Sequence, residues 1–238
     1  MAPHGEGSEE AMVVQDENRK PISSILIVIA MQTEAMPVVN KFQLKEDLDP
    51  VFPKGVPWVR YHGIYKDLHI NLVWPGKDLT LGVDSVGTIS ASLVTYAAIQ
   101  ALQPDLIINA GTAGGFKVFD LYGVGLRQCF STPNLLKELN LKAGKLSTGD
   151  SLDMSPQDEA SIVANDATVK DMEGAAVAYV ADLLKVPAIF IKAVTDIVDG
   201  DKPTAEEFLQ NLAAVTAALD QAVAQVVDFI SGKCLSEL

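Results

Sequence analysis

Arginine is scarce in this chain of 238 residues. Only Arg19, Arg60 and Arg127 are present, and they are far apart in the sequence. Sites that grip phosphate usually rely on arginine forks, so the sequence does not favour a phosphate-binding site. The 18 basic and 31 acidic residues give a formal net charge of −13, which repels nucleic acid and anionic lipid surfaces. We therefore expect neither nucleic acid nor a membrane as a partner.

Cysteine and histidine are also few. Cys129 and Cys234 cannot build a disulfide framework, and a reducing, cytoplasmic compartment fits them. The three histidines, His4, His62 and His69, show no spacing typical of metal ligands. We expect a protein that requires no metal and no cofactor.

No apolar run approaches the roughly 20 residues that span a bilayer. Residues 1–21 are polar and acidic without a signal-like or transit-like pattern, and they predict a disordered tail. With 48% hydrophobic residues, the remaining chain, residues 22–238, is expected to fold as one domain.

Apolar runs alternate with helical patterns along that domain. Strands are predicted at residues 23–30, 68–74, 105–110 and 186–194, three of them continuous enough to be buried on both faces. Helices are predicted at residues 90–102, 174–185 and 205–231. The alternation indicates an α/β protein, with helices on both faces of a mostly parallel sheet.

Chemically active side chains follow three of these strands. Glu34 comes after the first, Thr112 lies in a glycine-rich turn after the third, and Asp196 follows the last, while Glu173 opens a helix. Ligands of open α/β sheets bind outside the carboxyl ends of the strands, so these residues are expected to converge. A single acid such as Glu34 in a first helical turn can equally serve the helix dipole. Four such residues together favour a site.

Six short segments, in this order, resemble the motifs of the 5′-methylthioadenosine nucleosidases, most closely the plant branch. They are IAMQTEA at 29–35, DSVGT at 84–88, INAGTAGG at 108–115, STGD at 147–150, DMEGA at 171–175 and VTD at 194–196. The likeness runs from about Pro21 to the C-terminus. It implies a nucleoside phosphorylase-like fold, a three-layer α/β/α sandwich with a mostly parallel, mixed central sheet.

The resemblance implies three catalytic residues. Asp196 protonates N7 of adenine, Glu34 positions and deprotonates the attacking water, and Glu173 binds the ribose hydroxyls. Cleavage of an N-glycosidic bond passes through an oxocarbenium-like sugar. It therefore needs an acid at the leaving group, a base on water and nearby negative charge. We expect burial beside other acids to raise the pKa of Asp196.

The resemblance also implies residues that bind the substrate, an adenine nucleoside. Thr112 and the backbone of Met172 contact the sugar, and Leu152 packs on the purine. Gly87 and Met31 belong to the same motifs and are expected at the substrate as well.

The chain departs from the family pattern after Phe116 and Lys117. Relatives usually continue there into another strand with a Gly-Asp pair and a His-Asp loop, whereas here the sequence runs directly into 119–123 (FDLYG). On the order of two dozen residues are absent between about 117 and 119, enough for a strand and its connection. The absent stretch is expected to weaken the family's homodimer, and stability with it.

Three functions remain open from the sequence. The first is hydrolysis of 5′-methylthioadenosine to adenine and methylthioribose in methionine salvage; cleavage of S-adenosylhomocysteine as well depends on the width of the alkylthio pocket. The second is a catalytically impaired, nucleoside-binding deletion variant of that enzyme. The third is a nucleoside phosphorylase, which needs cationic or amide donors beside Thr112 and Gly87.

Overall fold

The computed structural model describes residues 19–48, 51–115, 127–152, 155–197 and 203–238. Its strands are β1 (Ser24–Val28), β2 (Lys45–Glu46), β3 (Val59–Tyr65), β4 (Leu68–Trp74), β5 (Leu106–Gly115), β6 (Leu146–Thr148), β7 (Val169–Asp171) and β8 (Ala188–Ile197). Its helices are α2 (Gln32–Lys41), α3 (Thr88–Leu102), α4 (Pro133–Leu139), α5 (Pro156–Ala164), α6 (Gly174–Leu183), α7 (Thr204–Ile230) and the short 3₁₀ helix η1 (Leu235–Glu237). The predicted tail, apart from residues 19–21, and the predicted junction at 117–119 lie outside the described residues.

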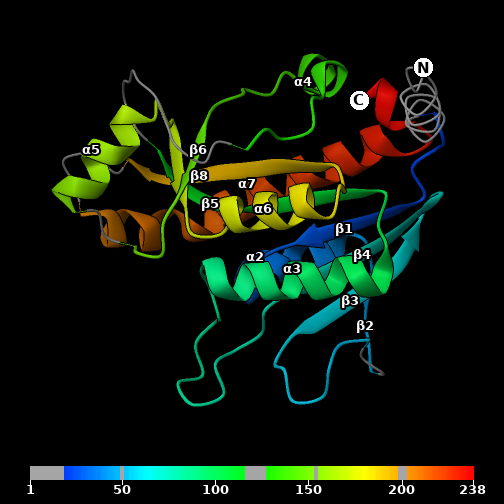
Figure 1. Cartoon of the computed structure of the whole chain (residues 1–238), viewed down its shortest axis with the longest axis horizontal. Coiled ribbons are helices and arrows are strands. Elements are labelled where there is room, and N and C mark those ends of the chain that lie inside the picture. The colour runs from blue at the N-terminus through cyan, green and yellow to red at the C-terminus, as the bar shows by residue number, and fades with distance from the viewer. Residues whose placement is uncertain (1–18, 49–50, 116–126, 153–154, 198–202) are drawn as a thin grey trace, which may run out of the picture.

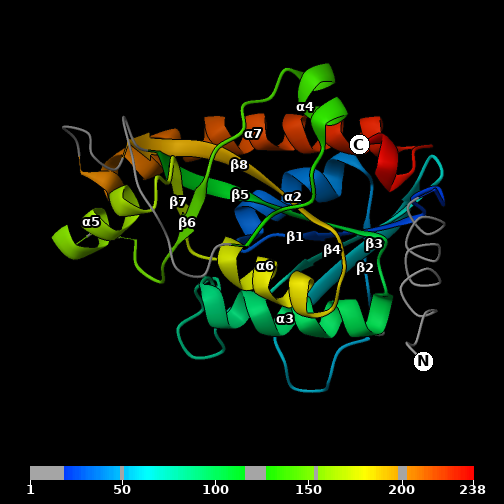
Figure 2. The same cartoon turned by 45° about the horizontal axis from the view of Figure 1, so that its top comes forward.

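The strands form one mixed sheet in the order β2-β3-β4-β1-β5-β7-β6, and β8 pairs with the other edge of β5. β1 runs parallel to β4 and β5, and β5 runs parallel to β8. Helices cover both faces: α3 and α6 lie on one side, and α2 and α7 on the other (Figures 1 and 2). The predicted three-layer α/β/α sandwich with a mostly parallel sheet is confirmed.

Strand β1 shows why a central strand of this sheet requires a continuous apolar run. Ile25 and Ile27 of β1 point into the core beneath α2 and α7, whereas Leu26 and Val28 point into the core beneath α3 and α6. Successive side chains of a strand face opposite sides, so a strand covered on both faces has no polar position. β1 and β5 are thereby fixed at the centre of the molecule.

The glycine-rich stretch is strand rather than turn, which corrects the sequence prediction. β5 continues through Gly115, and β8 likewise continues through Thr195 and Asp196. The two strands pair along this whole length, with an irregularity between Ala113 and Gly114, while β7 pairs with the other edge of β5 at Gly114 and Gly115. Strand partners on both sides satisfy the backbone groups, which overrides the turn preference of glycine. Thr112 and Asp196 are therefore held inside strands, near their carboxyl ends.

Within the described residues, one helix, α7, is long and apolar enough to cross a membrane by length and composition. A core helix of a globular protein meets the same test. In its C-terminal half, Leu219, Val223 and Ile230 are fully buried in the core. Packing inside the protein thus accounts for the apolar face, and the N-terminal turns of α7 reach the site described next.

Candidate active site

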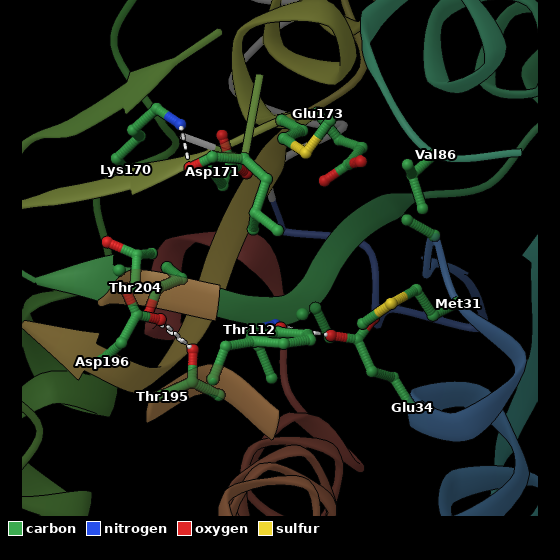
Figure 3. Close-up of a pocket in the computed structure, with 18 of the residues that line it drawn as sticks. Met31, Glu34, Val86, Thr112, Lys170, Asp171, Glu173, Thr195, Asp196 and Thr204 are labelled. Atoms are coloured by element: carbon green, nitrogen blue, oxygen red, sulfur yellow. Dashed lines mark hydrogen bonds between the residues drawn. The ribbon is translucent and has the colours of Figure 1, made fainter. Parts of the chain in front are cut away.

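A cavity of about 280 Å³ opens beside the carboxyl ends of β1, β5 and β8 (Figure 3). Glu34, Thr112 and Asp196 line it, and so does Glu173 from the start of α6. The four residues that the sequence singled out at strand and helix ends are therefore brought together. Figure 3 shows Thr112 between Asp196 and Glu34 in this view, with Glu173 across from them.

Glu34 is held by Thr112. Its side chain lies in the first turn of α2 and is only 2% exposed. Its Oε1 atom accepts hydrogen bonds from the backbone N–H of Thr112 (2.8 Å) and from the Thr112 hydroxyl (2.7 Å). Burial raises the pKa of Glu34, while the two bonds from Thr112 and the positive charge of Lys192 oppose that rise. Two donors and a nearby cation suit the carboxylate form.

Asp196 has a different environment, although it is buried to a similar degree, at 4% exposure. Its Oδ1 accepts a hydrogen bond from the Thr195 hydroxyl (2.7 Å), and Oδ2 has no partner among the described residues. Burial, assisted by the negative charge of Glu207, raises the pKa of Asp196. A buried oxygen without a donor suits a protonated carboxyl group that can give its proton to a ligand.

Glu173 is the N-cap residue of α6, and its side chain crosses to α3. Its Oε1 accepts a hydrogen bond from the backbone N–H of Gly87 (2.8 Å), the N-cap of α3. Burial raises the pKa of Glu173 to about 7, and the charges of Asp171 and Glu34 add to the rise, against the opposing effects of Lys192 and the Gly87 bond. Glu173 therefore exchanges its proton near neutral pH in the free protein.

The predicted substrate-binding residues are placed as follows. Met31, Thr112, Leu152 and Met172 line the cavity. Gly87 does not line it and reaches the site only through its bond to Glu173. Gly87 has a φ of 103°, and a Cβ there would lie 2.8 Å from Oδ1 of Asp150. The backbone conformation favours glycine at this position, and a larger residue would also have to displace the Asp150 side chain.

Sequence reasoning missed several residues of the site. Asp171 and Lys170 of β7 line the cavity, as do Thr195 of β8 and Phe208 of α7. Lys192 of β8 is bonded to Asp171 (2.7 Å), with both side chains almost fully buried. A lysine inside the apolar run VPAIFIKAV was the one signal that could have pointed to it, because a buried charge needs a partner.

The arrangement can carry out acid–base chemistry on one ligand. Four carboxyl groups line the same cavity, those of Glu34, Asp171, Glu173 and Asp196. Their hydrogen bonds differ: Glu34 has two donors on one oxygen, whereas one oxygen of Asp196 has no partner among the described residues. Burial raises the pKa of both Glu34 and Asp196, and the donors on Glu34 oppose that rise more directly. Such a difference in hydrogen bonding can separate a general base from a general acid. The one basic side chain among the described lining residues, Lys170, is bonded to the backbone carbonyls of Ser151 and Leu152.

Comparison with known proteins points to one family. The family model of the phosphorylase superfamily matches residues 24–122 and 122–228. The 5′-methylthioadenosine nucleosidase of Arabidopsis thaliana is 62% identical over 267 residues, covering 100% of both chains. The 5′-methylthioadenosine/S-adenosylhomocysteine nucleosidase of the same plant is 61% identical over 251 residues, covering 95% of this chain and 99% of that one. The apo structure of the Arabidopsis 5′-methylthioadenosine nucleosidase superposes with a TM-score of 0.89 at 64% identity, over 92% of this chain and 100% of that one.

Proposed function

This chain belongs to the phosphorylase superfamily and, within it, to the 5′-methylthioadenosine nucleosidases, and on that premise we propose that it hydrolyses 5′-methylthioadenosine to adenine and methylthioribose. The reaction is a step of methionine salvage. The observation that carries the proposal is the contrast between the two buried carboxyl groups, Glu34 with two donors and Asp196 with a bare oxygen, on one cavity.

Asp196 acts as the general acid. Asp196 lines the cavity, its buried Oδ2 has no partner among the described residues, and its raised pKa keeps a proton on the carboxyl group to higher pH than usual. Donation of that proton to N7 of adenine makes the base a neutral leaving group. A hydrogen bond to N7 would also give the unpartnered oxygen of Asp196 a partner, which a buried polar atom requires.

Glu34 acts as the general base on the attacking water. Both hydrogen bonds from Thr112 end on Oε1, so Oε2 is the atom that can accept a water proton. Thr112 fixes the carboxylate orientation through one backbone and one side-chain bond, which limits the positions that the water can take. The charge on Glu34 also lies close to the forming sugar cation.

Glu173 and its neighbour Met172 bind the ribose, with Thr112 on the same side. Glu173 accepts from Gly87, which aims the carboxylate across the cavity, and it supplies negative charge for the oxocarbenium-like sugar. Leu152 packs on the purine, and Met31 and Phe208 supply apolar surface for the alkylthio group.

A phosphorylase is the second candidate, because other members of the superfamily use phosphate in place of water. Such an enzyme needs cations at the phosphate. None of the three arginines, all described, lines the cavity: Arg60 is bonded to Asp47 and Asn71, and Arg127 contacts Asp182. The hydrolase is favoured for this reason.

We also propose that residues 22–238 form one nucleosidase domain that lacks a family segment near 117–119. Two findings support this: the Arabidopsis relative matches over 267 residues against the 238 of this chain, and the family model matches in two stretches that meet at residue 122. If the absent segment supports the substrate pocket, the chain is a nucleoside-binding protein with impaired catalysis.

We propose a homodimer in a reducing, cytoplasmic compartment. Ile89, Leu93 and Tyr96 of α3 follow helical spacing and are 73%, 53% and 49% exposed, and α3 contains no charged residue. Exposed apolar patches of this kind mark protein interfaces. Two chains that each carry a charge of −13 repel least where such an uncharged face meets its copy. The free thiols Cys129 and Cys234 suit a reducing compartment.

The deciding experiment measures adenine release from 5′-methylthioadenosine by the purified chain in phosphate-free buffer. Glu34→Gln and Asp196→Asn are compared with Glu138→Gln, a matched change of an exposed glutamate on α4. We expect the parent and Glu138→Gln to release adenine at equal rates and the other two variants to lose at least roughly 10²-fold. A parallel assay with S-adenosylhomocysteine tests whether the alkylthio pocket is wide enough to accept this larger substrate.

Each alternative predicts a different result. Turnover that appears only when phosphate is added supports the phosphorylase. A chain that melts cooperatively and binds the nucleoside, yet releases no adenine, supports the impaired binding protein and overturns the hydrolase proposal.

Analytical ultracentrifugation of the parent and of Leu93→Glu tests the dimer, which the added charge should dissociate.

A further inference from the structure

The proposed roles leave one buried ion pair without a task. Nζ of Lys192 in β8 lies 2.7 Å from Oδ2 of Asp171 in β7, and the two side chains are 7% and 0% exposed. Removing two charges from water offsets much of the attraction between them, so a buried pair is a poor source of stability. Its place beside the cavity calls for another explanation.

Asp171 is fixed from several directions. Its Oδ1 accepts a hydrogen bond from the Thr148 hydroxyl in β6 (2.6 Å), and its Oδ2 accepts one from the backbone N–H of Gly174 at the start of α6 (2.9 Å). The carboxylate therefore has a defined position before it meets Lys192. It also anchors the turn that carries Glu173, two residues further along the chain.

Lys192 reaches from this anchor toward Glu34. The two side chains meet over Gly111 of β5: a Cβ built on Gly111 would lie 3.5 Å from Nζ of Lys192 and 3.7 Å from Oε2 of Glu34. The positive charge of Lys192 lowers the pKa of both Glu34 and Glu173, in opposition to burial. The ammonium group donates to Asp171, however, and both hydrogen bonds to Glu34 come from Thr112.

We propose that Asp171 and Lys192 are a positioning pair for the hydrolysis, in which Asp171 holds the ammonium group beside Gly111. At that place the charge stabilises the carboxylate of Glu34 without occupying Oε2, the oxygen left for water. The inference rests on the proposed function. Neither residue reacts with the substrate; the pair acts through Glu34 and Glu173.

The charged groups around the ammonium are three carboxyl groups from three elements. Glu34 belongs to α2, Asp171 to β7 and Glu173 to the N-cap of α6, while Lys192 itself is on β8. The neighbouring β5 contributes Gly111, without a side chain, and the N–H and hydroxyl of Thr112. Lys192 is thus one cation among three acids, and its removal should favour protonation of Glu34.

The test compares pH profiles of kcat and KM for 5′-methylthioadenosine in Lys192→Met, Lys192→Arg and an exposed control, Lys137→Met on α4. We expect Lys192→Met to lose on the order of 10²-fold in kcat with a smaller change in KM. The acid limb of its pH profile, where kcat falls as Glu34 takes up a proton, should move to higher pH. Lys192→Arg should keep the acid limb of the parent, and Lys137→Met should match the parent throughout.

Asp171→Asn and the double variant Asp171→Asn/Lys192→Met show whether the two residues act together. If they do, the double variant loses no more kcat than the larger single loss, whereas independent residues would give the product of both losses.

The outcomes separate this inference from the function on which it rests. A parent chain that releases no adenine overturns both. An active parent whose Lys192→Met and Asp171→Asn variants melt as the parent does and keep its acid limb overturns the positioning pair alone. Shifted acid limbs with rescue by Lys192→Arg support it.

Discussion

Glu173 should destabilise the free protein at neutral pH, and its replacement by glutamine should reveal by how much. Burial raises its pKa from 4.5 to about 7, so the folded chain keeps the proton to higher pH than the unfolded chain. Between these two values the unfolded state has lost the proton and the folded state still holds it. Stability therefore falls as pH rises through this window, and the full loss is present above pH 7 or so.

The size of the loss follows from the pKa difference between the two states. A rise from 4.5 to about 7 corresponds to roughly 3 kcal/mol, at about 1.4 kcal/mol per unit. Glutamine carries no charge at any pH, and its carbonyl oxygen can still accept the Gly87 N–H. Glu173→Gln should thus gain nothing near pH 4.5 and most above pH 7. For a chain of this size the gain corresponds to roughly 6–12 °C in Tm.

Thermal melts followed by circular dichroism at about pH 5 and pH 8 measure this difference. The quantity of interest is the change in Tm between Glu173→Gln and the parent, because the other titrating groups contribute to both chains alike. Glu138→Gln serves as the exposed control and should show the same small effect at both pH values. A Glu173→Gln variant whose Tm gain does not grow with pH would refute the reasoning.

Three further changes test the site. Asp196→Asn should lower kcat about 10²- to 10⁴-fold and remove the alkaline limb of the pH profile, and a surviving limb would assign it to another group. Thr112→Val keeps the backbone donor to Glu34 but loses the hydroxyl, so the acid limb should rise and kcat/KM should fall about ten-fold in steady-state assays. Gly87→Ala should lower stability by about 1–3 kcal/mol in urea unfolding, since the Cβ would strain the backbone and meet Asp150; an unchanged midpoint contradicts this.

Much of the fold was predictable because it depends on local patterns. β4 has the predicted bounds, and β1, α3 and α6 begin or end within two residues of the predicted ones. A continuous apolar run indicates a strand that is buried on both faces, and apolar residues at helical spacing indicate a helix that is buried on one face. The error at the glycine-rich stretch has the opposite cause. Glycine has a local preference for turns, and only the pairing of β5 with β7 and β8 overrides it.

The sequence by itself determined the α/β class and the carboxyl groups that follow its strands, because parallel strands bring their carboxyl ends to one edge of the sheet. Only the tertiary structure decided how those groups differ. The bare oxygen of Asp196 and the two donors on Glu34 depend on which residues lie opposite each other in space. The pairing of Lys192 with Asp171 likewise requires β7 and β8 to meet opposite edges of β5, and no spacing along the chain encodes that contact.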